Sequence, residues 1–288
     1  MTEVGVIEAL ESMVGPVDHL DPVDRGYAHN NRMVATLRGG GSVFAKQAVD
    51  ELTAKWLRRE HRMYEALGDR SFVPAVVGWA DGERPLLVLE DLSGATWPPP
   101  WDSALIDAVL TMLGEVAASG RPEGLPRLVD GERADEGWHQ VEADPAAFLS
   151  LGLCDARWLE EAAPVLCRAA AAAPRAGDDL VHGDVRSDNL CFRSGGAVLF
   201  DWNFGAVGNA EFDVAFWLPS LAAEGGPPPE VVRADCPAEL AAYVSGFFAC
   251  RAGGPDIPHA PLVRRVQRQQ LETALPWAAR LLGLPEPG

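Results

Sequence analysis

The feature that most constrains the fold is a polar loop between short apolar stretches, in the segment LVHGDVRSDNLCFRSGGAVLFDW at 180–202. This pattern predicts a strand, a loop and a hairpin that turns at 194–196, where a serine and two glycines follow one another. A hairpin returns to the end where it began, so Asn189 and Asp201 are expected at the same end. Their amide and carboxylate oxygens suit Mg²⁺, which takes few protein ligands and completes its shell with water and phosphate oxygens.

Asp184 lies in the same loop, five residues before Asn189. It is not needed as a metal ligand, and a carboxylate at this place can accept the proton of an attacking hydroxyl. We expect His182 to orient the loop through hydrogen bonds rather than to act as the base. One short segment therefore holds both a candidate base and a candidate metal site.

The first 92 residues predict a small sheet with one prominent helix. Two strands, at 31–38 and 43–49, flank a glycine-rich turn, and Lys46 falls in the middle of the second strand. Only two of the 24 basic residues are lysines, so Lys46 is a candidate for a role that arginine does not fill. Further along, Asp50 is placed to cap a helix over 51–67 that ends at Gly68, and strands are expected over 72–79 and 85–90.

Three consecutive prolines in SGATWPPPW at 93–101 exclude a helix or a central strand there. We place the domain boundary just before this segment, which gives an N-terminal lobe over 1–92 and a C-terminal lobe over 93–288. The second lobe is expected to be mainly helical. Helices are expected over 102–118, 144–151, 156–173 and most of the chain from 212 onward, with loops over 119–137, 224–229 and 252–261 and a frayed tail over 283–288.

The charge of the chain argues against nucleic acid as a partner. The net charge is −18, so a polyanion would be repelled over most of the surface. Of the 42 acidic residues, 27 follow Leu92, against 14 of the 24 basic residues. This acidic excess can attract a cationic small molecule, although general solubility explains it equally well.

The sequence also bears on location. No window approaches the roughly 18 uninterrupted apolar residues of a membrane span, and the start MTEVGVIEALESMVG lacks the basic and apolar regions of an export signal. The five cysteines form no CxxC pair, which argues against a disulfide framework or a zinc cluster. We therefore expect a cytoplasmic protein without nucleic-acid or membrane partners, as a monomer or a homodimer.

The motif HGDxxxxN from His182 to Asn189, followed by Asp201, resembles that of the aminoglycoside phosphotransferase and choline-kinase-like family, relatives of protein kinases. The resemblance covers nearly the whole chain, with five elements in the correct order. It implies an α+β, bilobal, protein-kinase-like fold. The small N-terminal lobe would hold an antiparallel sheet, and the larger C-terminal lobe would be mainly helical.

Further matches to this family come from the rest of the chain. Lys46 in VFAKQA is similar to the nucleotide lysine, and Glu60 in the following helix is similar to its ion-pair partner. LVLEDLSG resembles the hinge whose backbone holds the adenine, which makes Glu90 and Leu92 nucleotide-binding candidates. Asp213 in GNAEFDVAFW resembles the aspartate that buttresses the catalytic loop.

The family mechanism implies a role for each matching residue. Asp184 would orient and deprotonate the acceptor hydroxyl, while Asn189 and Asp201 would hold Mg²⁺ against the phosphates of ATP or GTP. Lys46 would pair with the α- and β-phosphates and would be fixed by Glu60. Positioning and charge neutralisation then do most of the work of an in-line transfer.

The sequence departs from the family pattern in three places. The expected glycine-rich loop at 24–31 has one glycine, so Asn30 and its neighbours would cap a phosphate oxygen by side chain. Asp201 is followed by Trp-Asn-Phe rather than Phe-Gly, so we expect no switch built on a mobile Phe. Arg186 stands where protein kinases have a lysine, and either stabilises the migrating phosphoryl group or forms an ion pair with a nearby carboxylate.

These features predict a kinase of a small-molecule hydroxyl. An aminoglycoside or related antibiotic is the leading acceptor, with resistance as the outcome, because the acidic second lobe suits a polycation. One alternative acceptor is a neutral sugar, an amino alcohol, a nucleoside-type antibiotic or another metabolite, and the alternative of another class is a degenerate kinase-fold binding module. Tryptophans that could stack on the acceptor, or simply belong to the core, are found at positions 97, 101, 138 and 158.

Overall fold

The computed structural model describes residues 3–23, 30–130, 137–258 and 260–288. The chain divides into two compact units that do not follow the sequence order. The first comprises the chain up to Pro98 together with Asp188–Phe204, and the second comprises Pro99–Ser187 and Gly205–Gly288. The boundary at residue 92 is drawn to separate a nucleotide-binding lobe from an acceptor-binding lobe. That division of roles stays a prediction.

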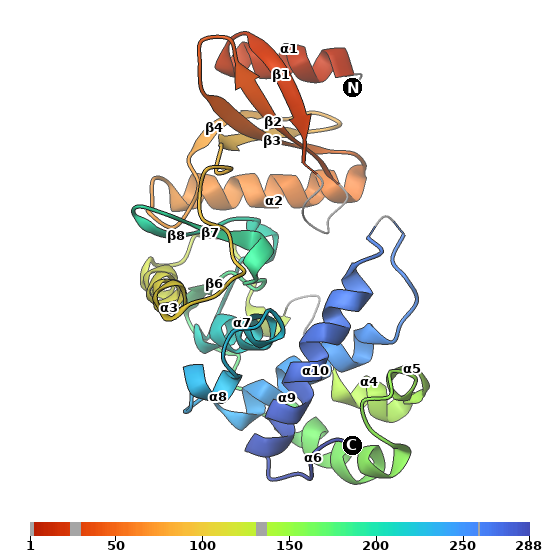
Figure 1. Cartoon of the computed structure of the whole chain (residues 1–288). Coiled ribbons are helices and arrows are strands. Elements are labelled where there is room, and N and C mark those ends of the chain that lie inside the picture. The colour runs from red at the N-terminus through yellow and green to blue at the C-terminus, as the bar shows by residue number, and fades with distance from the viewer. Residues whose placement is uncertain (1–2, 24–29, 131–136, 259) are drawn as a thin grey trace. The chain divides into compact units, whose positions relative to one another are not determined.

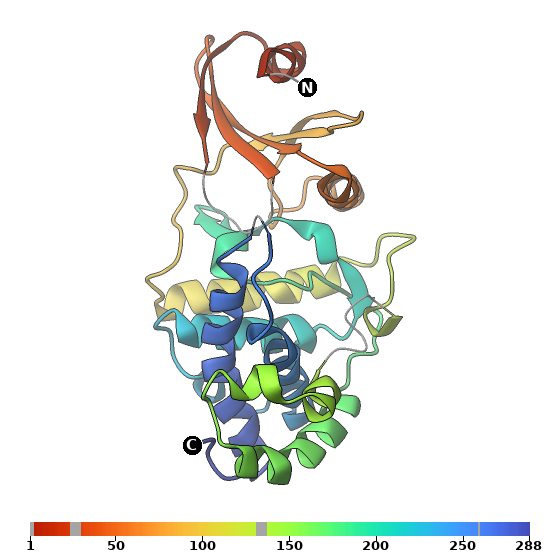
Figure 2. The same ribbon diagram turned by 90° about the vertical axis from the view of Figure 1, so that its right-hand side faces the viewer.

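The first unit is built on an antiparallel sheet with the strand order β1-β2-β3-β5-β4. The β2–β3 hairpin turns where the glycine-rich segment predicts it, with Thr36 paired to Ser42. The sheet lies between helices α1 and α2 (Figures 1 and 2). These elements are α1 (Glu3–Val14), β1 (Val17–Pro22), β2 (Asn30–Leu37), β3 (Ser42–Ala48), α2 (Glu51–Leu67), β4 (Val76–Ala80) and β5 (Leu86–Glu90).

The two faces of β3 carry different side chains. Val43 and Ala45 belong to a buried apolar cluster with Leu10 of α1, whereas Lys46 reaches Glu60 of α2. Because successive side chains of a strand point to opposite faces, one face of the sheet forms a core and the other presents a lysine. Neither α1 nor β1 is predicted from the sequence, since α1 owes its burial to tertiary packing and β1 lacks an alternating pattern.

Helix α2 begins and ends as its sequence predicts. The Asp50 carboxylate accepts a hydrogen bond from the Thr53 N–H at 2.8 Å, and the Thr53 hydroxyl accepts one from the Asp50 N–H at 3.0 Å. Gly68 follows the last turn with a φ of 60°, in the region that favours glycine. The strand expected over 72–79 is instead β4, because the Phe72 carbonyl accepts a bond from Leu199 of a distant hairpin.

That distant hairpin, β7 (Leu190–Arg193) with β8 (Gly196–Leu199), is part of the first unit. Thr96 and Phe192 exchange backbone hydrogen bonds of 2.9 and 2.8 Å, and the Trp97 ring packs edge-on to Phe200. The hairpin is therefore fixed to the segments that follow α2 and β5. Short helical turns lie at its two ends: η2 (Ser187–Asn189) and η3 (Trp202–Phe204).

The second unit is mainly helical, and its core is formed by α7, α9 and α10 (Figure 1). Two short strands, β6 and β9, pair antiparallel next to the loop that holds Asp184. The elements are α3 (Ser103–Ala118), η1 (Leu128–Asp130), α4 (Trp138–Ala143), α5 (Ala146–Leu149), α6 (Ala156–Ala171), β6 (Asp179–Val181), β9 (Ala206–Gly208), α7 (Glu211–Ala223), α8 (Pro229–Val232), α9 (Ala238–Ala252) and α10 (Val263–Leu281).

Several local expectations for this unit differ from the structure. The helix expected over 144–151 covers only Ala146–Leu149, and α4 precedes it where no helix is predicted. Helix α4 is held by Trp138, whose indole N–H donates to the Ala242 carbonyl at 3.0 Å, a contact with no local sequence signal. The tail over 283–288 is not free, because the Trp158 indole N–H donates to the Pro285 carbonyl at 2.9 Å.

None of the helices in the described part of the chain combines the length and the apolar composition that crossing a membrane requires.

Candidate active site

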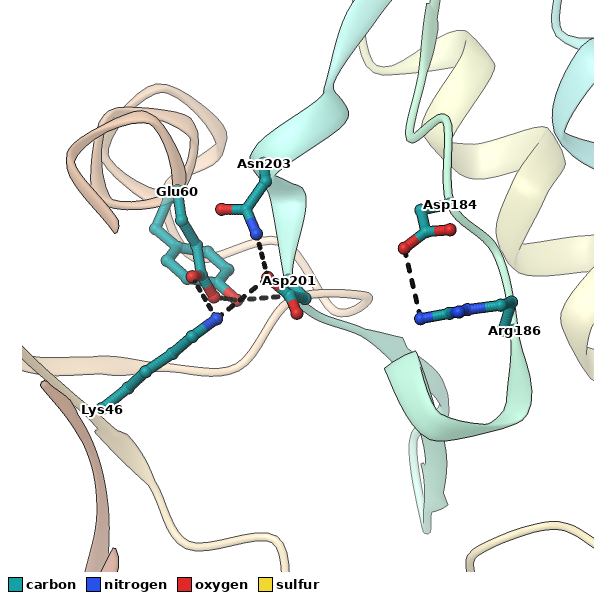
Figure 3. Close-up of polar contacts among 7 residues, drawn as sticks. Lys46, Glu60, Asp184, Arg186, Asp201 and Asn203 are labelled. Atoms are coloured by element: carbon teal, nitrogen blue, oxygen red, sulfur yellow. Dashed lines mark hydrogen bonds and ion pairs between the residues drawn. The ribbon is translucent and has the colours of Figure 1, made fainter. Parts of the chain in front are cut away.

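The first unit brings Lys46, Glu60 and Asp201 together (Figure 3). Lys46 extends from the middle of β3, Glu60 from α2 and Asp201 from the end of the β7–β8 hairpin. The Lys46 Nζ lies 2.6 Å from Glu60 Oε2 and 2.9 Å from Asp201 Oδ1. The lysine is thus held between a helix and a hairpin that lie far apart in the sequence.

The electrostatics of this group keep Lys46 charged. Burial alone would lower the pKa of Lys46, but the Asp201 and Glu60 carboxylates outweigh it and the pKa lies above its ordinary value. Burial raises the pKa of Glu60, while the Lys46 ammonium opposes that rise. A fixed ammonium in this position can bind phosphate oxygens.

Tyr64 supports both carboxylates and is not suggested by the sequence. Its hydroxyl donates to Glu60 Oε1 at 3.1 Å and accepts from the Asp201 N–H at 3.3 Å. Burial raises the pKa of Tyr64 well above its ordinary value, so the phenol keeps its proton. Tyr64 lies one helical turn after Glu60, a spacing that places both side chains on one face of α2.

Asp201 has an unusual backbone. Its φ of 65° lies in the left-handed region, and among the described residues it is the one residue other than glycine found there. The Asn203 amide Nδ2 donates a short hydrogen bond to Asp201 Oδ1 (Figure 3). Strained backbone is retained where the surroundings impose it, often at functional sites. Asn203 therefore helps to set the orientation of the Asp201 carboxylate.

The hairpin register places Asn189 and Asp201 at the same end. Leu190 pairs with Leu199, and the Phe200 N–H donates to the Asn189 carbonyl at 3.0 Å. An amide oxygen and a carboxylate oxygen are chemically suited to Mg²⁺. The described residues contain no group of three or more His, Cys, Asp or Glu that could hold a metal, so a magnesium ion here would rely on these two residues and on nucleotide phosphates.

Asn30, a further nucleotide candidate, lies in the first unit together with a second cation, Arg32. Asn30 pairs with Ala48, and Arg32 pairs with Lys46, so both share the Lys46 face of the sheet. The Arg32 charge acts on Lys46 by opposing the rise in its pKa, a second cation on this face that the sequence does not reveal. Residues 24–29 of the expected phosphate loop, His29 included, lie outside the described residues.

At the expected hinge, the side chain of Glu90 is already used. Its carboxylate accepts a bond from the Ala75 N–H at 3.0 Å and a short one from Arg193. The Leu92 carbonyl accepts from the Ala95 N–H and the Trp97 indole N–H. The Glu90 N–H also donates, to the Ala75 carbonyl at 2.9 Å. A main-chain contact of Glu90 with a nucleobase would therefore use its carbonyl, whereas one of Leu92 would use its N–H.

In the second unit, Asp184 forms an ion pair with Arg186 (Figure 3). The distance between Asp184 Oδ2 and the Arg186 guanidinium is 3.3 Å, and the two side chains are 24% and 20% exposed. Of the two roles considered for Arg186, the structure displays the ion pair with a nearby carboxylate. The partial exposure of Asp184 leaves it accessible to a hydroxyl group.

The loop that carries Asp184 is held by Asp213 of α7. The Asp213 carboxylate accepts bonds from the His182 N–H at 2.6 Å and the Gly183 N–H at 2.8 Å. Burial raises the pKa of Asp213 to about 6, against the two N–H groups, which lower it. His182 is fully buried and its Nδ1 accepts from the Asp184 N–H at 3.2 Å, as expected for a residue that orients the loop.

The model of the phosphotransferase enzyme family matches residues 19–248 of the chain. The chain belongs to this family. It is a phosphotransferase with an alcohol group as acceptor, and the expected α+β, bilobal, protein-kinase-like fold is confirmed. No curated protein sequence matches the chain.

Solved structures share the fold of this phosphotransferase at low sequence identity. A thermostable mutant of aminoglycoside phosphotransferase APH(4)-Ia is 15% identical, with a TM-score of 0.58 over 96% of this chain and 97% of that one. Choline kinase LicA from Streptococcus pneumoniae is 14% identical, with a TM-score of 0.61 over 98% of both chains. Amicoumacin kinase hAmiN is 12% identical, with a TM-score of 0.53 over 94% of this chain and 93% of that one.

Proposed function

We propose that this phosphotransferase transfers the γ-phosphate of ATP or GTP to a hydroxyl of an aminoglycoside or related antibiotic, and so confers resistance. The observation that carries the nucleotide half of this proposal is the buried Lys46, held between Glu60 and Asp201. Structures of this fold include an aminoglycoside phosphotransferase bound to GDP and hAmiN bound to AMP-PNP and Ca²⁺. The nucleotide and a divalent metal are therefore reasonable cofactors for this chain.

On the nucleotide side, each residue has a distinct task. Lys46 binds the α- and β-phosphates, and Glu60 keeps its ammonium in place. Asn189 and Asp201 hold Mg²⁺, which when bound neutralises charge on the phosphates. The backbone of Glu90 and Leu92 contacts the nucleobase, and Asn30 contacts a phosphate oxygen. The region 1–92 contributes most of these groups, and 93–288 binds the acceptor.

On the acceptor side, Asp184 orients the hydroxyl and takes its proton. Its ion pair with Arg186, at 3.3 Å, holds the carboxylate beside the loop. When a phosphoryl group approaches, Arg186 can exchange this partner for a phosphate oxygen, because guanidinium binds both groups in the same way. Proton removal and charge stabilisation then come from neighbouring positions of one loop.

The acceptor is proposed from charge. The acidic excess beyond Leu92 favours a polycation over a neutral molecule, and one neighbouring structure holds GDP and kanamycin. A neutral sugar, an amino alcohol, a nucleoside-type antibiotic or another metabolite is the alternative acceptor, and LicA is a choline kinase. We place the reaction in the cytoplasm, since all five cysteines are free thiols and ATP is made there, and we propose a monomer or a homodimer.

A mass-shift screen tests the proposal. The chain is incubated with Mg²⁺ and ATP or GTP and a panel of aminoglycosides, other antibiotics, sugars and amino alcohols, and each product is examined for the mass of one added HPO₃ group. We expect an aminoglycoside to be modified. If only neutral compounds are modified, the acceptor is a neutral compound and not an aminoglycoside. Nucleotide binding in thermal shift with no product from any compound would favour the binding module.

A further inference from the structure

Tyr64 is a buried residue whose hydroxyl connects helix α2 to the turn at Asp201. The hydroxyl donates to Glu60 Oε1 at 3.1 Å and accepts from the Asp201 N–H at 3.3 Å. A hydroxyl has one proton to donate, and a main-chain N–H can only donate, so the direction of each bond is defined. One side chain thus binds both the partner of Lys46 and the main chain of a candidate metal ligand.

The bond to Glu60 sets the direction of its carboxylate. Oε2 faces the Lys46 ammonium at 2.6 Å, and Oε1 faces the Tyr64 hydroxyl. Because each oxygen has its own donor, the carboxylate cannot turn without breaking one of the two bonds. Glu60 is fully buried, and a buried oxygen that loses its donor costs free energy. Tyr64 therefore helps to keep Glu60 turned toward Lys46.

The bond to Asp201 acts on the main chain rather than on the carboxylate. Asp201 has a φ of 65°, which an L-residue other than glycine adopts at a cost. Rotation about the N–Cα bond changes the direction of the side chain relative to the N–H. Since Tyr64 holds that N–H, it helps to keep the backbone conformation on which the direction of the Asp201 carboxylate depends.

The rest of this turn is held by other contacts. Trp202 is fully buried, and its indole N–H donates to the Leu199 carbonyl at 3.0 Å. The Trp202 ring lies with its centroid 6.2 Å from that of Phe72. A phenylalanine at position 64 would keep the ring and lose only the two hydroxyl bonds. The contribution of the hydroxyl can therefore be separated from the packing of the turn.

The two residues that Tyr64 steadies have different tasks in the proposed reaction. Lys46 binds the phosphates of the nucleotide, and Asp201 holds the Mg²⁺ that belongs to the same phosphates. A ligand gripped at two points is bound most tightly when the two points are already held in place. Tyr64 is bonded to the carboxylate that holds one and to the main chain of the other.

We propose that Tyr64 is a positioning residue of this phosphotransferase and that its hydroxyl couples nucleotide binding to Mg²⁺ binding. The inference rests on the nucleotide half of the proposed function and adds a residue that touches neither the phosphates nor the metal. Tyr64 acts through Glu60 and Asp201. Without its hydroxyl both groups are still present, but they are held less firmly, so Mg²⁺ strengthens nucleotide binding less.

The test is calorimetric titration of the full chain with AMP-PNP and with GMP-PNP, each in EDTA and in excess Mg²⁺. The Kd without Mg²⁺ divided by the Kd with Mg²⁺ measures the coupling between metal and nucleotide. The main variant is Tyr64→Phe. A second is Tyr64→Met, whose flexible side chain fills the space without a hydroxyl.

Two further variants make the comparison specific. Tyr243→Phe removes another buried tyrosine hydroxyl, one that accepts from Arg175 at 3.2 Å in the second unit, and is the matched control. Asp201→Asn, alone and combined with Tyr64→Phe, shows whether Tyr64 acts through Asp201. Thermal unfolding of each variant establishes that it is folded at the temperature of the titration.

We expect the Kd ratio of Tyr64→Phe to be about tenfold smaller than that of the wild type, the usual loss when a group that orients a metal ligand is removed. The Kd without Mg²⁺ should change much less, because the charge of Lys46 is kept. Tyr64→Met should behave like Tyr64→Phe, and Tyr243→Phe should match the wild type. In the Asp201→Asn background, Tyr64→Phe should lower the ratio no further.

Several results would overturn the inference and leave nucleotide binding standing. They are an unchanged ratio in Tyr64→Phe, an equal fall in Tyr243→Phe, a further tenfold fall in the Asp201→Asn background, and a wild type whose nucleotide binding Mg²⁺ does not strengthen. A wild type that binds neither AMP-PNP nor GMP-PNP would instead remove the proposed function together with the inference.

Discussion

The candidate site has a buried ion pair in the first unit and a partly exposed one in the second. In the first, Lys46 and Glu60 are 5% and 2% exposed and share a lysine-centred group with Asp201. In the second, Asp184 and Arg186 are 24% and 20% exposed. Buried charges must be paired before any ligand arrives, whereas partly exposed ones can be completed by the ligand. The first arrangement suits one constant substrate, the nucleotide, and the second suits an acceptor that differs among relatives.

The largest effect that we predict comes from the partly exposed Asp184 of the second unit. Asp184→Ala should lower kcat by about 10³-fold, because general-base help and hydroxyl orientation are both lost. Nucleotide affinity should be nearly unchanged, since none of the groups assigned to the nucleotide is altered. Steady-state kinetics with the identified acceptor, together with nucleotide titration, measure both. Full activity of this variant would mean that another group is the base.

Loss of a charge from the buried Lys46 group should lower the free energy of unfolding. Lys46→Met leaves Glu60 buried beside Asp201 without its ammonium partner, and we expect a loss of about 3 kcal/mol in the free energy of unfolding. Arg186→Met, which breaks the partly exposed pair, should cost under about 1 kcal/mol. Urea unfolding of both variants gives the comparison. Equal losses would mean that the two charged groups do not differ in the way that their burial indicates.

A pH effect should come from Asp213. Burial raises the pKa of Asp213 to about 6 from an ordinary value of 3.8, so between these values the folded chain keeps a proton that the unfolded chain has lost. The stability from this proton is present below about pH 4 and is lost as the pH rises through 6, a change of about 3 kcal/mol. The free energy of unfolding of wild type minus that of Asp213→Asn, measured across this range, should fall with pH. A difference that stays constant or rises would contradict the assignment.

The smallest effect concerns Asn203. Asn203→Ala removes the amide that donates to Asp201. We expect half-maximal activity to require about tenfold more Mg²⁺, the usual loss of metal affinity when a group that orients a metal ligand is removed. The free energy of unfolding in the absence of nucleotide should change little. A magnesium titration of activity at saturating nucleotide measures the shift, with Ser150→Ala, on an exposed turn of the second unit, as a control. An unchanged titration curve would show that Asp201 needs no such support.

The sequence predicts best what depends on neighbouring residues. Asp50 and Gly68 mark both ends of α2, and the serine and two glycines at 194–196 set the hairpin that carries Asn189 and Asp201 to one end. Motif spacing also leads to Lys46 and Glu60, which the structure brings together. These signals are local or belong to an ordered set of motifs.

The remaining features depend on contacts between distant segments. Tyr64 and Asn203 act through partners that only the folded chain places beside them. Helix α1 likewise forms a core with the sheet that no local pattern specifies. Tyr64 could have been suspected from its spacing to Glu60, and Asn203 from its place two residues after Asp201, but nothing near Trp138 in the sequence suggests its bond to Ala242.

The β7–β8 hairpin has a practical consequence for anyone who cuts this gene into pieces. A fragment that stops at residue 98 would lack Asn189 and Asp201, and would expose the surfaces at Phe72 and Thr96 on which the hairpin rests. Exchange of the nucleotide-binding half between relatives therefore requires two separate stretches of DNA to be transplanted together. A chimera with a single crossover would combine Lys46 from one parent with Asp201, the proposed metal ligand, from the other.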